Sequence, residues 1–307
     1  MKVLSAESNI GTATTVSSAT VVRLYNSDSG VGIVTRTDNA NSIIGNFTIP
    51  SGEVLYLQKK STDKLVASST VLASKVAYSH MMSYASYSSS GGGGGIPFRT
   101  SNLELYIDPA SYTSGTTVAD SSGNSRTYNL VNGVAHNTSP SRFTFDGTDD
   151  FLEAASDYSI TTTNSTFVVW IKRDGSQDGH AGIILDRSGG VGGLNFVSGS
   201  TFLGYNSNGY NTGLSISNAT WTMCAVSINS TTAKIYRFTS SSTPSTNTRT
   251  TTHSSTTFTN IKIGRDPFGD GARSFTGDIG HSLFYSATLS DSDIIDIYDN
   301  TKSTYGY

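Results

Sequence analysis

Carboxylate side chains are the first residues to examine for chemistry, because hydrolysis of a glycosidic bond uses two of them about 5–5.5 Å or 6.5–9.5 Å apart. The 307-residue chain has only these glutamates: Glu7, Glu53, Glu104 and Glu153. No two of them share a predicted strand, and the run from Glu104 to Asp108 continues into Pro109, which breaks the pattern. The carboxylates therefore predict no glycosidase centre.

The histidines and the single cysteine give no pattern for a metal or a nucleophile either. The histidines are dispersed along the chain, at His80, His136, His180, His253 and His281. None of them has the paired spacing of a zinc site. Cys224 lies among apolar residues of a predicted strand, so we expect an inert buried thiol and no disulfide. These residues together predict that the chain is not an enzyme.

One loop carries residues that suit a sugar ligand. Tyr205 and Tyr210 flank a polar segment that contains Asn206 and Asn208. Aromatic faces pack against the C–H surfaces of sugars, and amides bind their hydroxyls. We therefore predict a ligand site at these four residues, to which we add Arg187. The alternative, a loop that merely carries two exposed tyrosines, stays open.

Two acidic segments could hold calcium, which prefers clustered oxygen ligands. One segment contains Asp120 and Asn124, and the other contains Asp149 and Asp150. The same residues also suit tight turns, because aspartate accepts backbone hydrogen bonds and a neighbouring glycine supplies a positive φ. Both interpretations are open, and no other cofactor is indicated.

The composition predicts the kind of element that positions these residues. Hydrophobic residues make up 36% of the chain and charged residues 14%, with 31 glycines and 10% aromatics. A polar, weakly charged mixture that is rich in β-branched and aromatic residues favours sheets and tight turns over helices. The aromatics and the low charge also argue against disorder. The fold class is therefore predicted to be all-β.

Turn residues divide the chain into two modules. Residues 1–82 form a small β-sandwich or barrel, with strands predicted near residues 20–25, 32–36, 42–49 and 53–60. Residues 83–100 form a linker rich in serine and glycine, since five successive glycines rarely belong to a packed element. Residues 101–307 contain a further series of strands and one late helix, which Ser290 caps ahead of acidic residues.

Charge and hydropathy limit the partners. The formal net charge is −3, and the lysines and arginines are scattered, so no surface for nucleic acid is predicted. No run of about 20 apolar residues could cross a bilayer, and the first residues do not resemble a secretory signal. We expect no membrane insertion.

The second module resembles the laminin G-like, concanavalin A-like lectin/glucanase superfamily. The resemblance rests on residues 120–124, 130–133, 145–152, 167–172, 221–226, 261–265, 275–279 and 289–294, which follow the order of the family's motifs. It implies a jelly-roll β-sandwich that binds glycans or proteins at loops along one rim, in some members with calcium. The alternating Glu, Asp and Glu of its laminarinase-type glucanases are missing here.

The first module resembles a small β domain of virion structural proteins from tailed phages of cyanobacteria. The resemblance rests on residues 2–6, 19–26 and 71–78. It implies a capsid decoration or fibre-like protein at the virion surface, in which the first module anchors to other virion proteins and the second binds glycans or host-surface molecules. A small anchor favours a homo-oligomer, for which a trimer is one arrangement. The alternative is a free carbohydrate-binding module of cellular or extracellular origin.

Overall fold

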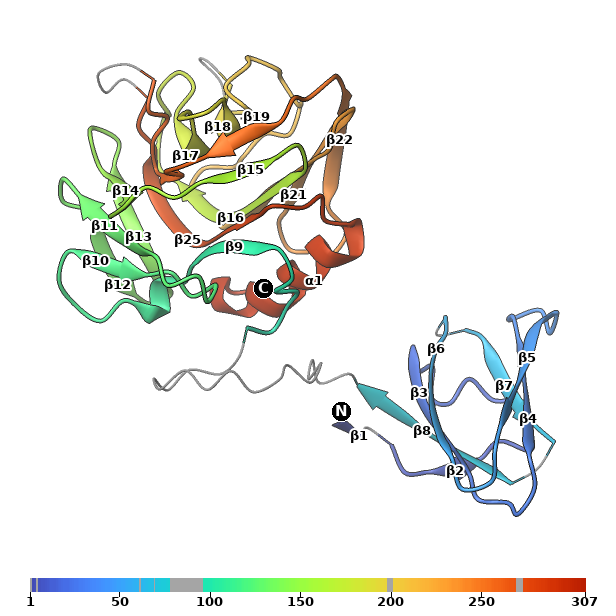
Figure 1. Ribbon diagram of the computed structural model, residues 1–307. Helices are drawn as coiled ribbons and strands as arrows, with labels where there is room; N and C mark the ends of the chain where they lie inside the picture. Colours follow the sequence, from blue (N-terminus) through green and yellow to red (C-terminus); the bar gives the residue numbers. More distant parts are fainter. Residues whose placement is uncertain are drawn as a thin grey trace. The chain divides into compact units, whose positions relative to one another are not determined.

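The computed structural model describes residues 2–3, 5–60, 62–68, 70–77, 96–197, 201–268 and 273–307 (Figure 1). The chain divides into two compact units, Met1–Gly94 and Gly95–Tyr307. Most of the predicted linker, residues 83–95, lies outside the described residues. Its last residues belong to the second unit, since Phe98 is fully buried in that unit's core. In the described residues no helix is long and apolar enough to span a membrane.

The first unit consists of two small antiparallel sheets. One has the order β1-β8-β3-β6, with β2 also paired to β8, and the other has the order β5-β4-β7. The strands are β1 (Lys2–Val3), β2 (Ser8–Asn9), β3 (Val21–Asn26), β4 (Gly32–Thr37), β5 (Ile43–Ile49), β6 (Val54–Gln58), β7 (Lys64–Ala67) and β8 (Val71–Ala77). Alternate residues such as Val22, Leu24 and Val34 face a shared core between the sheets.

Two larger antiparallel sheets form the second unit. The first has the order β10-β11-β14-β24-β17-β18-β19, and its strands are β10 (Thr117–Ala119), β11 (Thr127–Val131), β14 (Phe151–Ala154), β17 (Gly182–Asp186), β18 (Gly192–Phe196), β19 (Leu203–Tyr205) and β24 (Lys262–Ile263). The second has the order β12-β13-β25-β16-β20-β21-β22, with β9 also paired to β25. Its strands are β9 (Leu103–Ile107), β12 (Ala135–Thr138), β13 (Ser141–Asp146), β16 (Ser165–Arg173), β20 (Thr222–Ile228), β21 (Thr232–Phe238), β22 (Ser245–Thr250) and β25 (Thr276–Tyr285). A short ribbon of β15 (Ile160–Thr162) and β23 (Thr256–Phe258) lies beside them, and a 3-10 turn, η1 (Pro109–Ser111), follows β9.

The second sheet is covered on both faces, which explains its continuous apolar strands. Along β16, Phe167 and Val169 face the core between the two sheets, whereas Val168 and Trp170 face the opposite side. Successive side chains of a strand point to opposite faces, so both sets are buried only when both faces are covered. Trp170 is fully buried, and so is Cys224 on the neighbouring strand, as predicted for its thiol.

The helix α1 (Asp291–Thr301), followed by η2 (Lys302–Tyr305), covers the outer face of this sheet (Figure 1). Ser290 caps it in a reciprocal arrangement: its side chain accepts from the amide of Asp293, and the Asp293 side chain accepts from the amide of Ser290. Trp170 stacks between Tyr298 and Tyr305 and donates from Nε1 to Thr301 Oγ1 at 2.8 Å. The predicted helix start is confirmed.

The prediction of an all-β chain with one short late helix is confirmed. The first unit also has β7 and β8, beyond the four strands predicted for it. Sequence analysis named no strand over residues 245–258, where the structure has β22 and β23. Since β22 lacks apolar residues, it is defined by its register with β21 rather than by a hydrophobic pattern.

Candidate functional site

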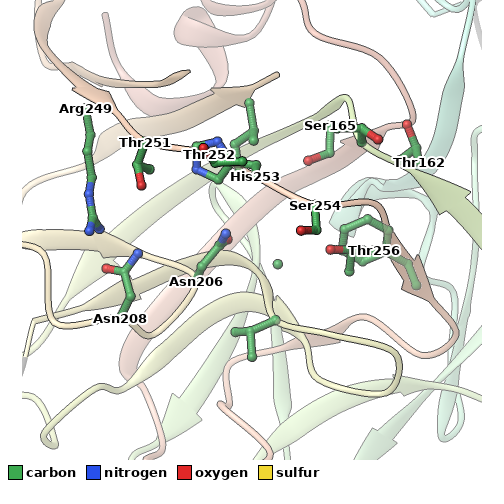
Figure 2. A pocket seen from close by; sticks show the side chains of 15 residues that line it. Thr162, Ser165, Asn206, Asn208, Arg249, Thr251, Thr252, His253, Ser254 and Thr256 are labelled. Carbon is green, nitrogen blue, oxygen red and sulfur yellow. The ribbon is translucent and has the colours of Figure 1, made fainter. Parts of the chain in front are cut away.

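A pocket of about 250 Å³ lies where the ends of several strands meet in the second unit (Figure 2). The ends of β15, β19, β20 and β22 and the beginnings of β16, β18 and β23 contribute to it. Its lining residues are Thr162, Thr163, Ser165, Val191, Gly192, Asn206, Asn208, Ile228, Arg249, Thr251, Thr252, His253, Ser254, Thr256 and Phe258. In Figure 2, Arg249 and Asn208 lie at one end and Thr162, Ser165 and Thr256 at the other. Hydroxyl and amide groups thus surround most of the cavity.

The turn after β19 brings two predicted residues to this pocket. Asn206 and Ser207 both adopt a positive φ, 52° and 48°, which reverses the chain directly after Tyr205. The side chain of Asn206 accepts from the amide of Gly193 at 3.1 Å, and Asn208 accepts from the amide of Tyr210 at 3.0 Å. These bonds use the carbonyl oxygens of both amides, so the NH₂ group of Asn206 remains a donor that can face a ligand, whereas the side chain of Asn208 also bonds to the Tyr205 hydroxyl.

The two tyrosines of the predicted site support the pocket from beneath instead of lining it. Tyr205 is fully buried, which corrects the expectation that its ring would present a face to a sugar. Tyr210 packs edge-on against Tyr205, with ring centroids 6.2 Å apart, and donates to Asn247 Oδ1 at 2.9 Å. Tyr205 lies in the core and the half-buried Tyr210 packs against it, an arrangement that the polar loop sequence does not reveal.

Arg249, which sequence analysis missed, is positioned by these rings. Its guanidinium lies 4.6 Å from the ring centroid of Tyr210 and 5.8 Å from that of Tyr205, within the range of cation–π contacts. Its Nη1 is buried and has no hydrogen-bond partner among the described residues. The residue as a whole is half-buried and lines the cavity, so its guanidinium can donate to an acceptor on a ligand.

His253 is held in one tautomer at the wall of the pocket. Nδ1 lies 2.9 Å from the carbonyl oxygen of Asn229, which can only accept, so Nδ1 carries the hydrogen. Nε2 is then the acceptor for the hydroxyl of Tyr205, 3.3 Å away. Burial lowers the pKa of His253, an effect that its bond to Asn229 opposes and the charge of Arg249 reinforces. The ring is therefore neutral near pH 7.

The described lining of the pocket carries a positive charge. Arg249 supplies a positive charge, whereas no aspartate or glutamate is among the described residues that line the cavity. The arrangement can donate hydrogen bonds to hydroxyls or to an anionic group. It offers neither of the two carboxylates that glycoside hydrolysis requires.

Arg187, the fifth predicted ligand residue, belongs to a different cluster. It pairs with the buried Asp266, which also pairs with Arg273 at 2.9 Å. The same aspartate accepts from Ser207 Oγ at 2.5 Å. Hydrogen bonds to both arginines and to Ser207 lower the pKa of Asp266 against the opposing effect of burial. Arg187 therefore holds the turn after β19 in place through Asp266 and does not line the pocket.

The four predicted calcium ligands do not form one site. Asp120 and Asp150 lie at opposite ends of β11. Asp120 follows β10 and lies near the start of β11, where Tyr128 pairs with Ala154. Asp150 lies near the end of β11, where Val131 pairs with Phe151. Asp120 accepts from the amides of Tyr106 and Ser122 at 2.9 and 2.8 Å. Asn124 donates to the carbonyl oxygens of Leu103 and Glu104 at 3.1 and 3.0 Å. These contacts fit the alternative interpretation of this pair, a structural turn.

Asp149 and Asp150 come together with a third carboxylate, Asp146. One oxygen from each of the three lies within 4.8 Å of the others. Asp146 also lines a second pocket of about 520 Å³ at the neighbouring strands β13, β25 and β16 of the second sheet, together with Lys172, Asp174 and Asp278. The sequence leaves the same two interpretations, a turn residue or a calcium ligand, open for Asp146.

Comparison with known proteins finds a family that matches part of the second unit. Residues 146–295 match the family model described as the concanavalin A-like lectin/glucanases superfamily. The match lies wholly within the second unit and includes every residue that lines the pocket. It supports the predicted jelly-roll fold. No curated protein matches the chain.

Several solved structures are similar at low identity. Domain 4 of AbnA, an extracellular GH43 arabinanase of Geobacillus stearothermophilus in complex with arabinotriose, is 17% identical, with 64% of this chain and 98% of that chain covered and a TM-score of 0.49. Trypanosoma rangeli sialidase is 12% identical over 83% of this chain and 44% of its own, with a TM-score of 0.49. A structure of botulinum neurotoxin type C, whose cell entry depends on two gangliosides, is 16% identical over 66% of this chain and 51% of its own, with a TM-score of 0.45. This chain thus spans less than half of the sialidase.

Proposed function

We propose that the second unit binds the end of a glycan in the pocket around Arg249 and does not cleave it. The observation that carries the proposal is a rim pocket lined by hydroxyl and amide groups, with an arginine whose Nη1 has no partner among the described residues. The match of residues 146–295 to a family of lectins and glucanases supports a saccharide ligand. The absence of carboxylates from the described lining supports binding without hydrolysis.

The dimensions and charge of the pocket narrow the ligand. A volume of about 250 Å³ lies just below the ~300–1,000 Å³ of pockets for drug-sized molecules. A short terminal saccharide therefore suits it better than an extended polymer. Arg249 can form charge-assisted hydrogen bonds, and no carboxylate in the described lining neutralises it. We expect a saccharide that ends in an acidic sugar to bind more tightly than its neutral counterpart.

A glycan array probed with the full chain, followed by calorimetry on the best ligand, tests this proposal. Arg249→Ala and Asn208→Ala should each weaken binding, Arg249→Ala by about tenfold or more, since hydrogen bonds to charged groups contribute about 1.5–3 kcal/mol. Arg265→Ala is the matched control, because it removes the same charge from the same unit outside the pocket. Equal affinity of Arg249→Ala and the wild type, or release of sugar from the bound glycan, would contradict the proposal.

For the whole chain, we propose a virion structural protein in which the first unit anchors to other virion proteins and the second is displayed at the virion surface. The resemblance of the first module to phage virion domains supports this role. The apolar side chains that this unit exposes, among them Ile43 at 68% and Ile44 at 51%, supply an attachment surface. The same surface would join copies of the chain into a homo-oligomer.

Mass spectrometry of purified virions from the phage that encodes the chain tests the second proposal. We expect the protein to sediment with intact particles and to remain after a high-salt wash, because apolar contacts are not screened by salt. Antibody labelling in electron microscopy should place the second unit on the outside. A protein that is found only in the soluble fraction would instead be a free carbohydrate-binding module.

A further inference from the structure

The turn after β19 contains one of the two Asn-Gly pairs of the chain, Asn208-Gly209; the other is Asn132-Gly133. The side-chain carbonyl of an asparagine can react with the amide nitrogen of the next residue, and glycine permits this approach because it has no Cβ. Gly209 is exposed with a φ of +70°, and a Cβ atom there would meet nothing within 4 Å. Asn208 is exposed as well, so water can reach both reacting groups.

The side chain of Asn208 folds back over its own backbone. Its Oδ1 accepts from the amide of Tyr210, two residues ahead, at 3.0 Å. This hydrogen bond closes an Asx turn, a ring of atoms that includes the amide nitrogen of Gly209. The Gly209 amide donates no hydrogen bond to the described residues. The carbonyl carbon Cγ of Asn208 is therefore held near a nitrogen that no acceptor occupies.

Asn132, in the other Asn-Gly pair, has a different arrangement. Its Nδ2 donates to the carbonyl oxygen of Asp149 at 3.1 Å, so its side chain is held against another segment of the chain. Its Oδ1 accepts from no amide among the described residues. The two pairs have the same residue types, and only Asn208 combines a side chain folded over the next peptide with a donor at its oxygen.

We propose that Asn208 is a self-modification site, at which the folded chain converts this asparagine to aspartate or isoaspartate. The Gly209 nitrogen loses its proton to hydroxide and forms a bond to Cγ of Asn208. Negative charge develops on Oδ1, where the amide of Tyr210 already donates, as in an oxyanion hole. The bond from Cγ to the side-chain nitrogen then breaks, ammonia leaves with a proton from water, and a cyclic imide remains. A water molecule opens this ring at either carbonyl carbon and supplies the oxygen of the new carboxylate.

The new carboxylate would lie beside Arg249, which supplies the positive charge of the described lining. Figure 2 shows Asn208 and Arg249 at the same end of the pocket, and both side chains bond to the hydroxyl of Tyr205. A carboxylate at position 208 can pair with the guanidinium and compete with an acidic sugar for it. The modification would thus switch off binding of acidic glycans. This consequence rests on the proposed glycan site, whereas the modification itself does not.

Peptide mapping by mass spectrometry tests the modification, during incubation of the full chain in mildly alkaline buffer made with water that contains heavy oxygen. Asn208 should lose ammonia and take up one heavy oxygen roughly tenfold or more faster than Asn132, because only Asn208 has a donor at the oxygen that gains charge. In urea, where neither contact exists, the two pairs should react at similar rates. An unchanged Asn208, or equal rates at the two pairs in the folded chain, would overturn the proposal.

Calorimetry with sialyllactose, a saccharide that ends in an acidic sugar, tests the effect on the pocket. The affinity of the wild type should fall by about tenfold or more as Asn208 converts, to the level that the variant Asn208→Asp shows from the start. Asn208→Gln is the control: its longer side chain disfavours the cyclic imide, so its affinity should not change during the incubation. A fully converted chain that binds as tightly as the fresh one would overturn the switch. A fresh chain that binds no saccharide would contradict the proposed function instead, and the peptide maps would still decide the modification.

Discussion

The two units differ in where they place their large apolar side chains. Among the described residues, the exposed ones in the first unit are Val31, Ile33, Ile43, Ile44, Val54 and Tyr56, whereas the much longer second unit exposes only Phe268. A small domain buries a smaller fraction of its surface than a large one, and its short sheets have few covered faces. The proposed attachment of the first unit to a partner would cover such side chains, and the second unit exposes no comparable set among the described residues.

The same difference is visible in single strands. β16 is apolar along both faces because a second sheet covers one face and α1 covers the other. β5 is an edge strand that pairs only with β4 in the described chain, and the adjacent residues Ile43 and Ile44 are both exposed. The register with β4 shifts at Ile44, and neither of these two adjacent side chains is covered at this end of β5. A strand of this kind readily pairs with another chain.

The largest expected effect comes from shortening a buried side chain in the core of the second unit. Phe167→Ala removes a fully buried ring that stacks on Phe284, with centroids 4.8 Å apart, and should lower the free energy of unfolding of the second unit by about 3–5 kcal/mol. Its unfolding midpoint in urea, followed by tryptophan fluorescence, measures the loss. The matched control Ile44→Ala, in the first unit, should change stability by about 0.5 kcal/mol or less in calorimetry. A large loss from Ile44→Ala would show that this residue is part of a core.

Where apolar residues alternate or follow one another between turn residues, the sequence predicted the elements well. β3, β4, β5 and β6 lie within about two residues of the predicted ranges, a normal uncertainty for element ends. The helix start was also predictable, because the Ser290 cap is a local arrangement of neighbouring residues. Burial, turns and caps depend on short stretches of sequence, so a single chain contains enough information for them.

Most of the pocket could not be predicted, because its residues come from segments without a hydrophobic pattern. Arg249 and His253 come from β22 and the residues after it, a segment rich in threonine and serine. The position of β22 follows from its pairing with β21 and not from a hydrophobic pattern. Tyr205 was assigned a ligand role because its loop is polar, although the ring lies in the core. Contacts between distant segments decide both outcomes, and those contacts are not visible in the sequence.

The two acidic turns, around Asp120 and Asp150, show that the role of a single aspartate also depends on contacts that the sequence does not reveal. Sequence analysis left two interpretations open for both acidic segments, since turn residues and calcium ligands are the same residue types. The structure separates the segments by their partners: Asp120 has backbone amides and Arg126, whereas Asp150 has a buried oxygen without a partner among the described residues. The number of partners of each oxygen, rather than the residue type, decides between a turn and a candidate ion site.

A smaller effect should follow from a charge on the exposed edge of the first unit. If β5 joins copies of the chain, Ile43→Lys should weaken self-association at least tenfold, about 1.4 kcal/mol, since lysine on an edge strand opposes pairing with another chain. Sedimentation velocity over a range of concentrations measures the association. The unfolding temperature of the monomer should stay unchanged, because the side chain is 68% exposed. Thr12→Lys, at another exposed position of the same unit, controls for the added charge. A wild-type chain that remains monomeric at every concentration would contradict self-association through β5. Attachment to other virion proteins would then be the proposed use of the exposed apolar residues of the first unit.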